Sequence, residues 1–491
     1  MKKFTLVALA MMASASCFAQ TTLWDGEDTK ITNRNGNAGF WGDANPKLAD
    51  NLETDGINPS AHCLKFTITK DSKVVKLPFR EWMKPSMNGS KRISFMIKKD
   101  VNENVQVELS DPTDGSAGYW KKQVVWYGGD KKWQKLVFDF SSNGDFDKPG
   151  LMTITAQTNE FEGEQTVYID NIVIEDAPRI NGKLFSDYNT ENPITGDLKL
   201  TGAWMKGVSS NADGDWKENT YNDFEYFNSQ ATDGVTSIDM RGTVTKDVDI
   251  NQFFKNPNTI VYADAAYDHA NVVVNGTAKN LELNEANAFN APEGFTAESV
   301  KLTRDVREGI NSFVLPFKVT ADELGASKVA TYNGCDLGKN IANFITAESV
   351  GANIPFLTMD VAEDNAAVDK VLTFTNKDIV ATPDNLGENF VGVYAPQNAE
   401  GIYGIDDKGM LHEGGAKATI AAFHAYLDLN VKGPASTPAR IAINGSILTA
   451  INGVTADKVA NTAVYDLSGR RVYGKLQKGL YIMNGKKVVV K

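Results

Sequence analysis

The sequence predicts an all-β protein, and two features of its residue pattern support the prediction. Apolar and polar residues alternate in many short runs, as around Ile93, Phe95 and Ile97, which is typical of strands with one buried face. Turn-forming pairs such as Asn275-Gly276 separate the runs. With 491 residues, the chain is long enough for two or three domains with full-sized hydrophobic cores.

The charge and the cysteines exclude several classes of partner. The chain carries 62 acidic and 50 basic side chains, a formal net charge of −12 at pH 7. Such a surface repels the phosphates of nucleic acids and of anionic membranes, so we expect neither as a partner. Beyond the N-terminal segment only Cys63 and Cys335 remain, far apart in the sequence, which predicts neither a disulfide framework nor a zinc site.

The N-terminal segment, residues 1–19, has the composition of an export signal. Lys2 and Lys3 form a basic head, residues 4–13 are mainly apolar, and small residues lead up to a cleavage point after Ala19. We therefore expect a protein that passes through the periplasm and is secreted or displayed on the outer cell surface. No later segment has about 18 uninterrupted apolar residues, so we expect no membrane span.

Residues 20–177 predict a sandwich of two sheets. Val105, Val107 and Leu109 alternate with polar residues, and the last predicted strand ends before Pro178. Short strands, frequent turn signals and the lack of a helical period are typical of this architecture.

Three motifs in this segment resemble the jelly-roll sandwich of carbohydrate-binding modules. They are an opening Trp24-Asp25-Gly26-Glu27, a W-x-K-x-x-F-x-F pattern that starts at Trp133, and a closing V-Y-I-D-N-I strand at residues 167–172. The resemblance covers about a third of the chain and implies a galactose-binding-like jelly roll that binds a polysaccharide or another glycan. It also implies one structural calcium with Glu27 and Asp170 as ligands, since carboxylates suit a hard cation.

Aromatic residues are dense in the same segment, which holds six of the eight tryptophans. A flat, partly exposed ring buries the apolar C–H face of a sugar at little entropic cost, while nearby amides and carboxylates bind the hydroxyls. Burial in the sandwich core is the alternative for each ring, and we assign Trp133 to the core. The predicted glycan-binding residues are Trp41, Trp82, Tyr119, Trp120, Trp126 and Tyr127.

The middle of the chain divides into two parts. Residues 178–234 are rich in Asn, Asp, Gly and Thr with scattered aromatics, and we expect a connector that packs on its neighbours. Residues 235–437 alternate again, which predicts a second β-rich domain. The segments GINSFVLPF at 309–317 and FHAYL at 423–427 resemble a β module of surface proteins from gut and oral Bacteroidota, and this resemblance implies no established activity.

The last segment, residues 438–491, differs from the rest in charge. From Asp466 onward it carries seven Lys and Arg residues and one acid, and Asn484-Gly485 indicates a hairpin. The motifs VYDLSGR at 464–470 and LQKGLYI at 476–482 resemble the C-terminal sorting domain of type IX secretion. The resemblance implies that the type IX secretion machinery is a partner. An ordinary hairpin that completes the preceding domain is the alternative.

Motifs of catalysis are missing from the sequence. It contains no nucleophile elbow, zinc-protease motif or phosphate-binding loop, and its four histidines stand in unrelated contexts. His424 lies in an alternating apolar run, which favours a satisfied strand residue over a catalytic base. We therefore expect a non-enzymatic glycan-binding protein. Two alternatives stay open: a structural or adhesive surface protein that binds host protein, and a glycoside hydrolase, whose paired carboxylates are neighbours only in space.

Overall fold

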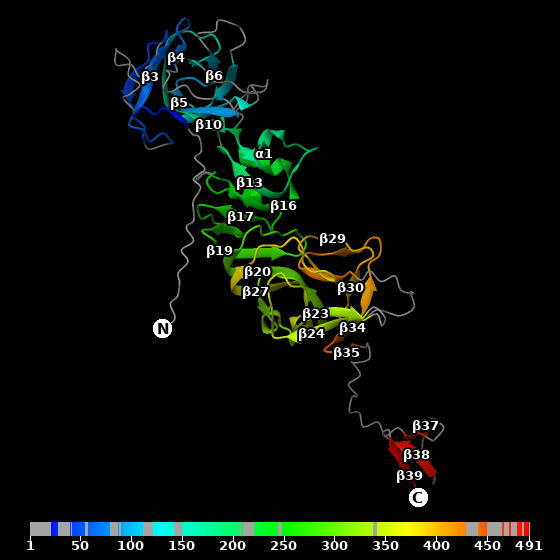
Figure 1. Cartoon of the computed structure of the whole chain (residues 1–491). Coiled ribbons are helices and arrows are strands. Elements are labelled where there is room, and N and C mark those ends of the chain that lie inside the picture. The colour runs from blue at the N-terminus through cyan, green and yellow to red at the C-terminus, as the bar shows by residue number, and fades with distance from the viewer. Residues whose placement is uncertain are drawn as a thin grey trace, which may run out of the picture.

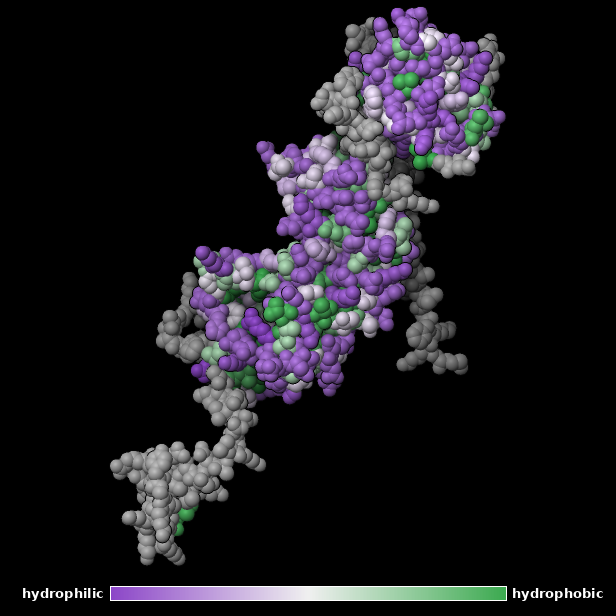
Figure 2. Space-filling view, turned by 180° about the vertical axis from the view of Figure 1, so that it is seen from behind, coloured by the Kyte–Doolittle hydropathy of each residue, from purple (hydrophilic) through white to green (hydrophobic). Residues whose placement is uncertain are grey.

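The computed structural model confirms the all-β prediction. It describes residues 21–27, 40, 42–54, 57–78, 87, 90–110, 121–141, 150–205, 208–209, 220–243, 248–336, 341–428, 440–448, 464–465, 471–472, 479–483 and 486–490. Among these residues there is one α-helix, and it is too short to cross a membrane. The chain runs from a sandwich through a stack of strands to a small C-terminal sheet (Figure 1), and the face seen in Figure 2 is mainly hydrophilic where it is described.

The first body is the predicted two-sheet sandwich. The larger sheet has the order β15-β14-β8-β5-β10-β3-β2, with β1 paired to β10, and the smaller sheet has the order β4-β9-β6-β7. Alternate side chains point between the sheets, where Phe66, Phe95 and Phe138 are buried in one core. The strands are β1 Thr21–Trp24, β2 Lys47–Asp50, β3 His62–Ile68, β4 Val74–Pro78, β5 Lys91–Lys99, β6 Glu103–Ser110, β7 Lys121–Tyr127, β8 Gln134–Asp139, β9 Leu151–Thr155, β10 Gln165–Asp176, β14 Val208–Ser209 and β15 Thr220–Tyr221.

The second body is a nine-stranded sheet of the order β12-β11-β13-β16-β17-β18-β19-β20-β27. The pairs from β13 to β18 are parallel, and β17 is buried on both faces, as parallel strands commonly are. The elements are β11 Arg179–Ile180, β12 Lys183–Leu184, η3 Phe185–Asp187, β13 Ile194–Thr201, α1 Asp223–Gln230, β16 Ala231–Asp239, η4 Ile250–Phe253, β17 Ile260–Ala263, β18 Val272–Val274, β19 Thr277–Asn284, β20 Phe295–Val306 and β27 Ala367–Ile379.

The predicted connector, residues 178–234, belongs mainly to this second body, while its strands β14 and β15 extend the larger sheet of the sandwich. It supplies the first strands of the nine-stranded sheet and helix α1, whose N-terminus is capped by the side chain of Asn222. Its aromatic residues are core residues: Trp204 and Phe224 are buried together with Phe253. The polar residues of the segment lie in turns between short buried elements. Its composition is therefore polar and did not indicate a packed unit.

Buried asparagines close the turns between the parallel strands. Asn258 is fully buried, donates from Nδ2 to the carbonyls of Asn284 and Asn287, and accepts the N–H of Asn284. Asn271 makes the corresponding pair of contacts with the carbonyl and the N–H of Glu282. An amide side chain offers both a donor and an acceptor, so each asparagine satisfies backbone groups that the turns leave unpaired.

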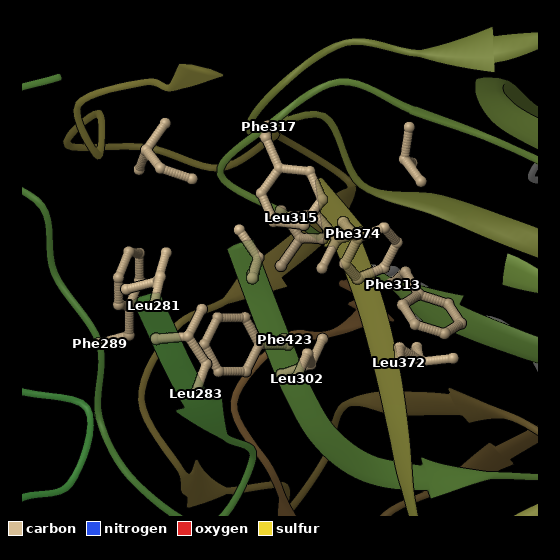
Figure 3. Packing of buried hydrophobic residues seen from close by; sticks show 14 of the residues in the cluster. Leu281, Leu283, Phe289, Leu302, Phe313, Leu315, Phe317, Leu372, Phe374 and Phe423 are labelled. Atoms are coloured by element: carbon tan, nitrogen blue, oxygen red, sulfur yellow. The ribbon is translucent and has the colours of Figure 1, made fainter. Parts of the chain in front are cut away.

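The remaining strands complete the second domain around a shared core. Leu302 and Phe374 of the nine-stranded sheet pack with Phe313, Phe317 and Phe423 from the following strands and loops (Figure 3). The sheets have the orders β21-β26-β23-β24-β34-β35, β28-β33-β30-β31, β22-β25 and β29-β32. The elements are β21 Gly309–Phe313, β22 Val319–Thr320, η5 Asp322–Leu324, β23 Lys328–Asp336, β24 Ile341–Ala347, β25 Ser349–Val350, β26 Phe356–Val361, η6 Glu363–Asn365, β28 Phe390–Val393, β29 Gln397–Asn398, β30 Tyr403–Ile405, β31 Leu411–Glu413, β32 Thr419–Ile420, β33 His424–Leu427, β34 Arg440–Ile443 and β35 Ser446–Ile447.

Arg92 of β5 joins the sandwich to the second body. Its guanidinium is buried and donates to both carboxylate oxygens of Asp223, the first residue of α1, at 2.8 and 3.2 Å. It also donates to Asp139 of β8 at 2.9 Å. A second connection runs through the backbone, because β14 pairs with β8 and so extends the larger sheet.

A separate antiparallel sheet stands at the C-terminus, in the order β37-β36-β38-β39. Its strands are β36 Val464–Tyr465, β37 Arg471–Val472, β38 Gly479–Met483 and β39 Lys486–Val490. Met483 pairs with Lys486, so the two strands that flank Asn484-Gly485 form the predicted hairpin, while these two turn residues lie outside the described part. The role of this sheet as a sorting signal stays a prediction.

Changing Asn258 to Ala should destabilise the second body by about 3 kcal/mol, because three buried backbone groups would lose their partners. Calorimetry or denaturant unfolding of the full chain measures the effect. Asn280→Ala is the matched control, since Asn280 is exposed on β19 and should change stability by less than about 0.5 kcal/mol. Equal effects of the two variants would contradict the structural role of the buried asparagine.

Candidate functional site

The smaller sheet of the sandwich turns one face to the core and the other outward. Val105 and Val107 of β6 are buried in the core. Asn104, Gln106 and Glu108 alternate with them and therefore lie on the outer face. This face is the first candidate site, because it gathers polar side chains on a rigid sheet.

Cross-strand pairs arrange the outer face in rows. Trp126 of β7 lies opposite Asn104 of β6. The next row holds Val124, Gln106, Thr155 and Val74, and the third holds Lys122, Glu108, Thr153 and Lys76. The sheet thus offers an indole, amides, hydroxyls, a carboxylate and ammonium groups side by side, a mixture that suits the C–H faces and hydroxyls of a sugar. The role of these polar residues was not predicted from the sequence, although their alternation with valines is visible there.

Trp126 differs from the other tryptophans that the structure describes. Trp24, Trp133 and Trp204 are 1, 9 and 2% exposed, respectively, whereas Trp126 is only half-buried. It lies on β7, an edge strand of the smaller sheet. Of the described tryptophans, this indole is therefore the one whose ring is open to a ligand.

Two polar groups of the outer face, Asn104 opposite Trp126 and Glu108 in the third row, are positioned for a ligand. Asn104 is 2% exposed, and its Oδ1 has no hydrogen-bond partner among the described residues. A buried acceptor without a donor is costly, and a ligand hydroxyl would satisfy it. Burial raises the pKa of Glu108, and the charges of Lys122 and Lys76 offset part of this rise.

The predicted role of Tyr127 is wrong. Its side chain is fully buried in the sandwich core, its hydroxyl donates to the carbonyl of Lys132 at 2.7 Å, and the ammonium of Lys99 lies 5.8 Å from its ring centre. Lys99 is itself buried, and this burial lowers its pKa to about 8. Neighbouring strand residues point to opposite faces, so the exposure of Trp126 and the burial of Tyr127 have the same cause.

The other predicted aromatic ligands, Trp41, Trp82, Tyr119 and Trp120, lie outside the described residues, and their roles stay predictions. Trp133 is buried, as expected, but not in the main core. It packs with Cys63 and Met96 on the outer face of the larger sheet. Its indole N–H donates to Asn51.

The carboxylates predicted to hold calcium lie near each other, but hydrogen bonds already occupy them. Glu27 accepts the backbone N–H of His62 and contacts its ring at 2.9 Å, and this contact lowers the pKa of Glu27. Asp170 is fully buried and accepts from Asn58 and from the N–H of Asn171. In the described part of the chain, no three acidic, His or Cys side chains gather to hold a metal. Both carboxylates therefore have hydrogen-bond partners, and calcium at this place stays a prediction.

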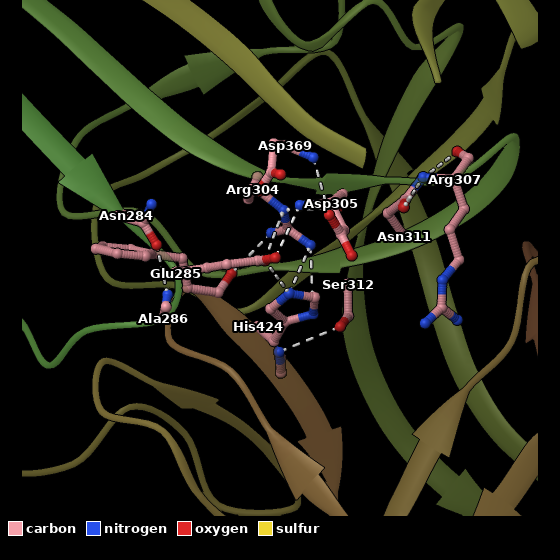
Figure 4. A network of polar contacts seen from close by, with 12 residues as sticks. Asn284, Glu285, Ala286, Arg304, Asp305, Arg307, Asn311, Ser312, Asp369 and His424 are labelled. Atoms are coloured by element: carbon pink, nitrogen blue, oxygen red, sulfur yellow. Dashed lines mark hydrogen bonds and ion pairs between the residues drawn. The ribbon is translucent and has the colours of Figure 1, made fainter. Parts of the chain in front are cut away.

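A second polar cluster lies in the other domain, where Arg304, Glu285 and His424 line a cavity of about 490 Å³ (Figure 4). His424 Nε2 is 2.7 Å from Glu285, and Arg304 Nη2 lies 3.1 Å from Nε2 and 3.3 Å from Nδ1. Because a carboxylate can only accept, Nε2 donates its hydrogen to Glu285. Burial, together with the charge of Arg304, lowers the pKa of His424 to about 4, so the ring is neutral at pH 7.

This cluster has a structural role. Arg304 also donates to the carbonyl of Phe423, whose backbone has a φ of 65°, a region that a bulky residue occupies only under constraint. The guanidinium lies 3.7 Å from the ring centre of Phe313. His424 is therefore a strand residue with partners, as the sequence predicted, and the cluster fixes a strained turn against the nine-stranded sheet.

Solved structures that are similar to part of this chain include carbohydrate-binding modules with β-sandwich folds and glycoside hydrolases. The family 11 carbohydrate-binding module of a cellulosomal cellulase from Clostridium thermocellum is 15% identical, with 32% of this chain and 95% of that module covered and a TM-score of 0.22. A xylan-binding domain from Paenibacillus barcinonensis is 13% identical over 31% of this chain and 90% of that domain, with a TM-score of 0.22. An exo-β-agarase is 14% identical, with a TM-score of 0.24. The match covers 32% of this chain and 25% of that enzyme. No protein-family model and no curated protein matches the sequence.

Asp170 should make the stability of the sandwich depend on pH. Burial raises its pKa from 3.8 to about 6, so between these values the folded state binds more protons than the unfolded state. The free energy of unfolding therefore falls as pH rises from about 4 to 7, by about 2 kcal/mol from this group. Unfolding of the wild type and of Asp170→Asn in chelator, from pH 4.5 to 7.5, isolates this contribution as the difference between the two chains.

A difference that does not change with pH would contradict this assignment. The same measurement with added Ca²⁺ at pH 7.5 tests the predicted calcium. A melting temperature that rises for the wild type and not for Asp170→Asn would show binding at this carboxylate.

Proposed function

We propose that this protein is a non-catalytic glycan-binding protein, and that the outer face of the smaller sandwich sheet is its binding face. The observation that carries the proposal is the half-buried indole of Trp126 opposite Asn104, whose side-chain oxygen has no partner among the described residues. Trp126 would stack on the C–H face of a sugar ring. Asn104, Gln106 and Glu108 would bind its hydroxyls.

The extent of this face and the arrangement of its side chains favour a polysaccharide over a small ligand. The rows are formed by hydrogen-bonded strands, so several sugar rings can lie along them without ordering any loop. Each stacked ring that buries about 100 Å² of apolar surface contributes about 2.5 kcal/mol. Hydroxyl contacts add specificity more than affinity, because they replace hydrogen bonds to water.

Trp126→Ala should weaken binding at least about tenfold, since the loss of an aromatic anchor residue costs about 2 kcal/mol. Affinity electrophoresis of the full chain against a panel of neutral plant and algal polysaccharides measures the change. Trp126→Phe keeps a stacking ring and should retain part of the affinity. Val368→Ala removes an apolar side chain that is 78% exposed in the other domain and should change nothing.

Two results would overturn the proposal. One is that the wild type binds no polysaccharide of the panel, and the other is that Trp126→Ala binds as tightly as the wild type. In either case a structural or adhesive protein that contacts host protein becomes the better interpretation. A release of reducing sugar by the purified chain would instead identify a glycoside hydrolase.

We further propose that the protein is exported and delivered by type IX secretion to the outer surface or the medium. The basic C-terminal sheet and its motifs support this proposal. Deletion of residues 464–491 should retain the protein in the periplasm of a host that has the secretion machinery, as measured in the culture supernatant and on intact cells. The purified truncated chain should still bind glycan, which controls for folding. Unchanged export would remove the proposal.

A further inference from the structure

The larger sandwich sheet carries a second cavity, on the face that points away from the core. It has a volume of about 320 Å³ and is lined by residues of β2, β3, β5 and β10 together with Trp133. These strands belong to the larger sheet, whereas Trp126 belongs to the smaller one, so the cavity is a different place from the proposed glycan face. The half-buried ring of Tyr168 lies in its wall.

Cross-strand register surrounds Tyr168 with lysines. Tyr168 of β10 lies opposite Lys65 of β3 on one side and opposite Lys98 of β5 on the other, and each ammonium is 5.6 Å from the centre of its ring. Lys65 in turn lies opposite Lys47 of β2. The row Lys98, Tyr168, Lys65 and Lys47 is therefore a basic strip on a protein whose formal net charge is −12.

Neighbouring carboxylates neutralise the lysine charges of this strip only in part. Two carboxylates, Asp50 and Glu53, also line the cavity. Glu53 pairs with Lys98 and Asp50 lies 3.8 Å from the ring of His62, but neither Lys47 nor Lys65 forms an ion pair within the described part of the chain. Like charges placed directly opposite each other on neighbouring strands destabilise a sheet. An anionic group bound between Lys47 and Lys65 would remove that repulsion. It would also form charge-assisted contacts with their ammonium groups.

The wall of the cavity is held in place by Asn51. Its side chain donates to the carbonyls of Asn58 and Ser60 and accepts from the indole of Trp133 and from the N–H of Glu53. These contacts connect residues 51–53 to residues 58–60 before any ligand arrives. A site built in advance loses little entropy when it binds.

One exposed apolar side chain lies in the lining of the cavity. Leu52 is 90% exposed, and a leucine with this exposure contributes nothing to the fold by burial. Leu48 of β2 pairs with the core residue Leu64 and so points to the other face of the sheet. Together with Tyr168, Leu52 offers an apolar surface next to the ammonium groups of Lys65 and Lys98.

We propose that this cavity binds an acidic saccharide, one whose ring carries a uronate carboxylate or a sulfate ester. Tyr168 and Leu52 contact the C–H face of the sugar ring, and Lys65, with Lys47 and Lys98, binds the anionic group. The inference goes beyond the proposed function, because it needs neither Trp126 nor any residue of the smaller sheet. The protein would then hold two saccharides on opposite faces of one sandwich.

The test uses the full chain and three soluble polysaccharides: polygalacturonate as the carboxylate, a carrageenan as the sulfate ester, and a neutral galactan. Binding is measured by affinity electrophoresis at about 0.15 M salt, where long-range repulsion between the acidic chain and a polyanion is largely screened. The wild type should bind at least one acidic polymer more tightly than the neutral galactan. The preferred acidic polymer distinguishes a carboxylate from a sulfate site.

Lys65→Met keeps the apolar stem and removes the charge, and it should weaken binding of the acidic polymer about tenfold. Lys70→Met is the matched control, because Lys70 is an exposed lysine of the same domain that does not line the cavity, and binding should not change. Tyr168→Leu should also weaken binding. Trp126→Ala should leave it unaltered, so that failure here and failure of the proposed function are separate results.

Three results would each overturn the inference. The first is that the wild type binds neither acidic polymer. The second is that Lys65→Met binds the acidic polymer as tightly as the wild type, and thus no differently from the control Lys70→Met. The third is that Trp126→Ala abolishes binding of the acidic polymer, because the ligand would then lie on the other face. Since Lys65 and Lys70 are both exposed, neither substitution removes a core contact.

Discussion

The structure depends on one buried ion pair, in which Arg92 of the sandwich binds both oxygens of Asp223. Neither side chain is accessible to water, so removal of one would leave the other charge buried without its main counterion, at a cost of about 3 to 5 kcal/mol. The pair attaches the sandwich through the β8 side of its larger sheet. Strands β2 and β3, at the opposite end of that sheet, stay clear of the junction.

The rest of the second body follows the same constraint, that buried polar groups need partners. Asn258 and Asn271 supply these partners where parallel strands turn, and Arg304 supplies them where Phe423 forces the backbone into a strained region. Such fully paired residues are poor candidates for chemistry, because each donor and acceptor is already engaged. The sandwich differs. On its outer faces, the side-chain oxygen of Asn104 has no hydrogen-bond partner and Lys65 has no ion pair among the described residues.

Several elements could be predicted from the sequence, and particular residues explain where prediction failed. The alternation at Val105 and Val107 indicated a strand, and the structure has one there. On β7, the apolar pairs Val124-Val125 and Trp126-Tyr127 follow each other. Whichever face of the strand is buried, one of the two aromatic rings points outward, so the sequence did not show which one. Only the pairing with β6 decided that Tyr127 is buried. The unit at residues 178–234 was missed because its polar turns dominate its composition.

The sequence by itself determined the class of protein: an all-β chain with a tryptophan-rich sandwich and terminal segments that differ in composition from the rest. These properties are local, since period and composition do not depend on which strands become neighbours. Tertiary structure decided which side chains share a surface. Lys47, Lys65, Lys98 and Tyr168 are far apart in the sequence and meet only through the registers of four strands. Strand pairing is a long-range property, and the grouping of side chains on both faces of the sandwich follows from it.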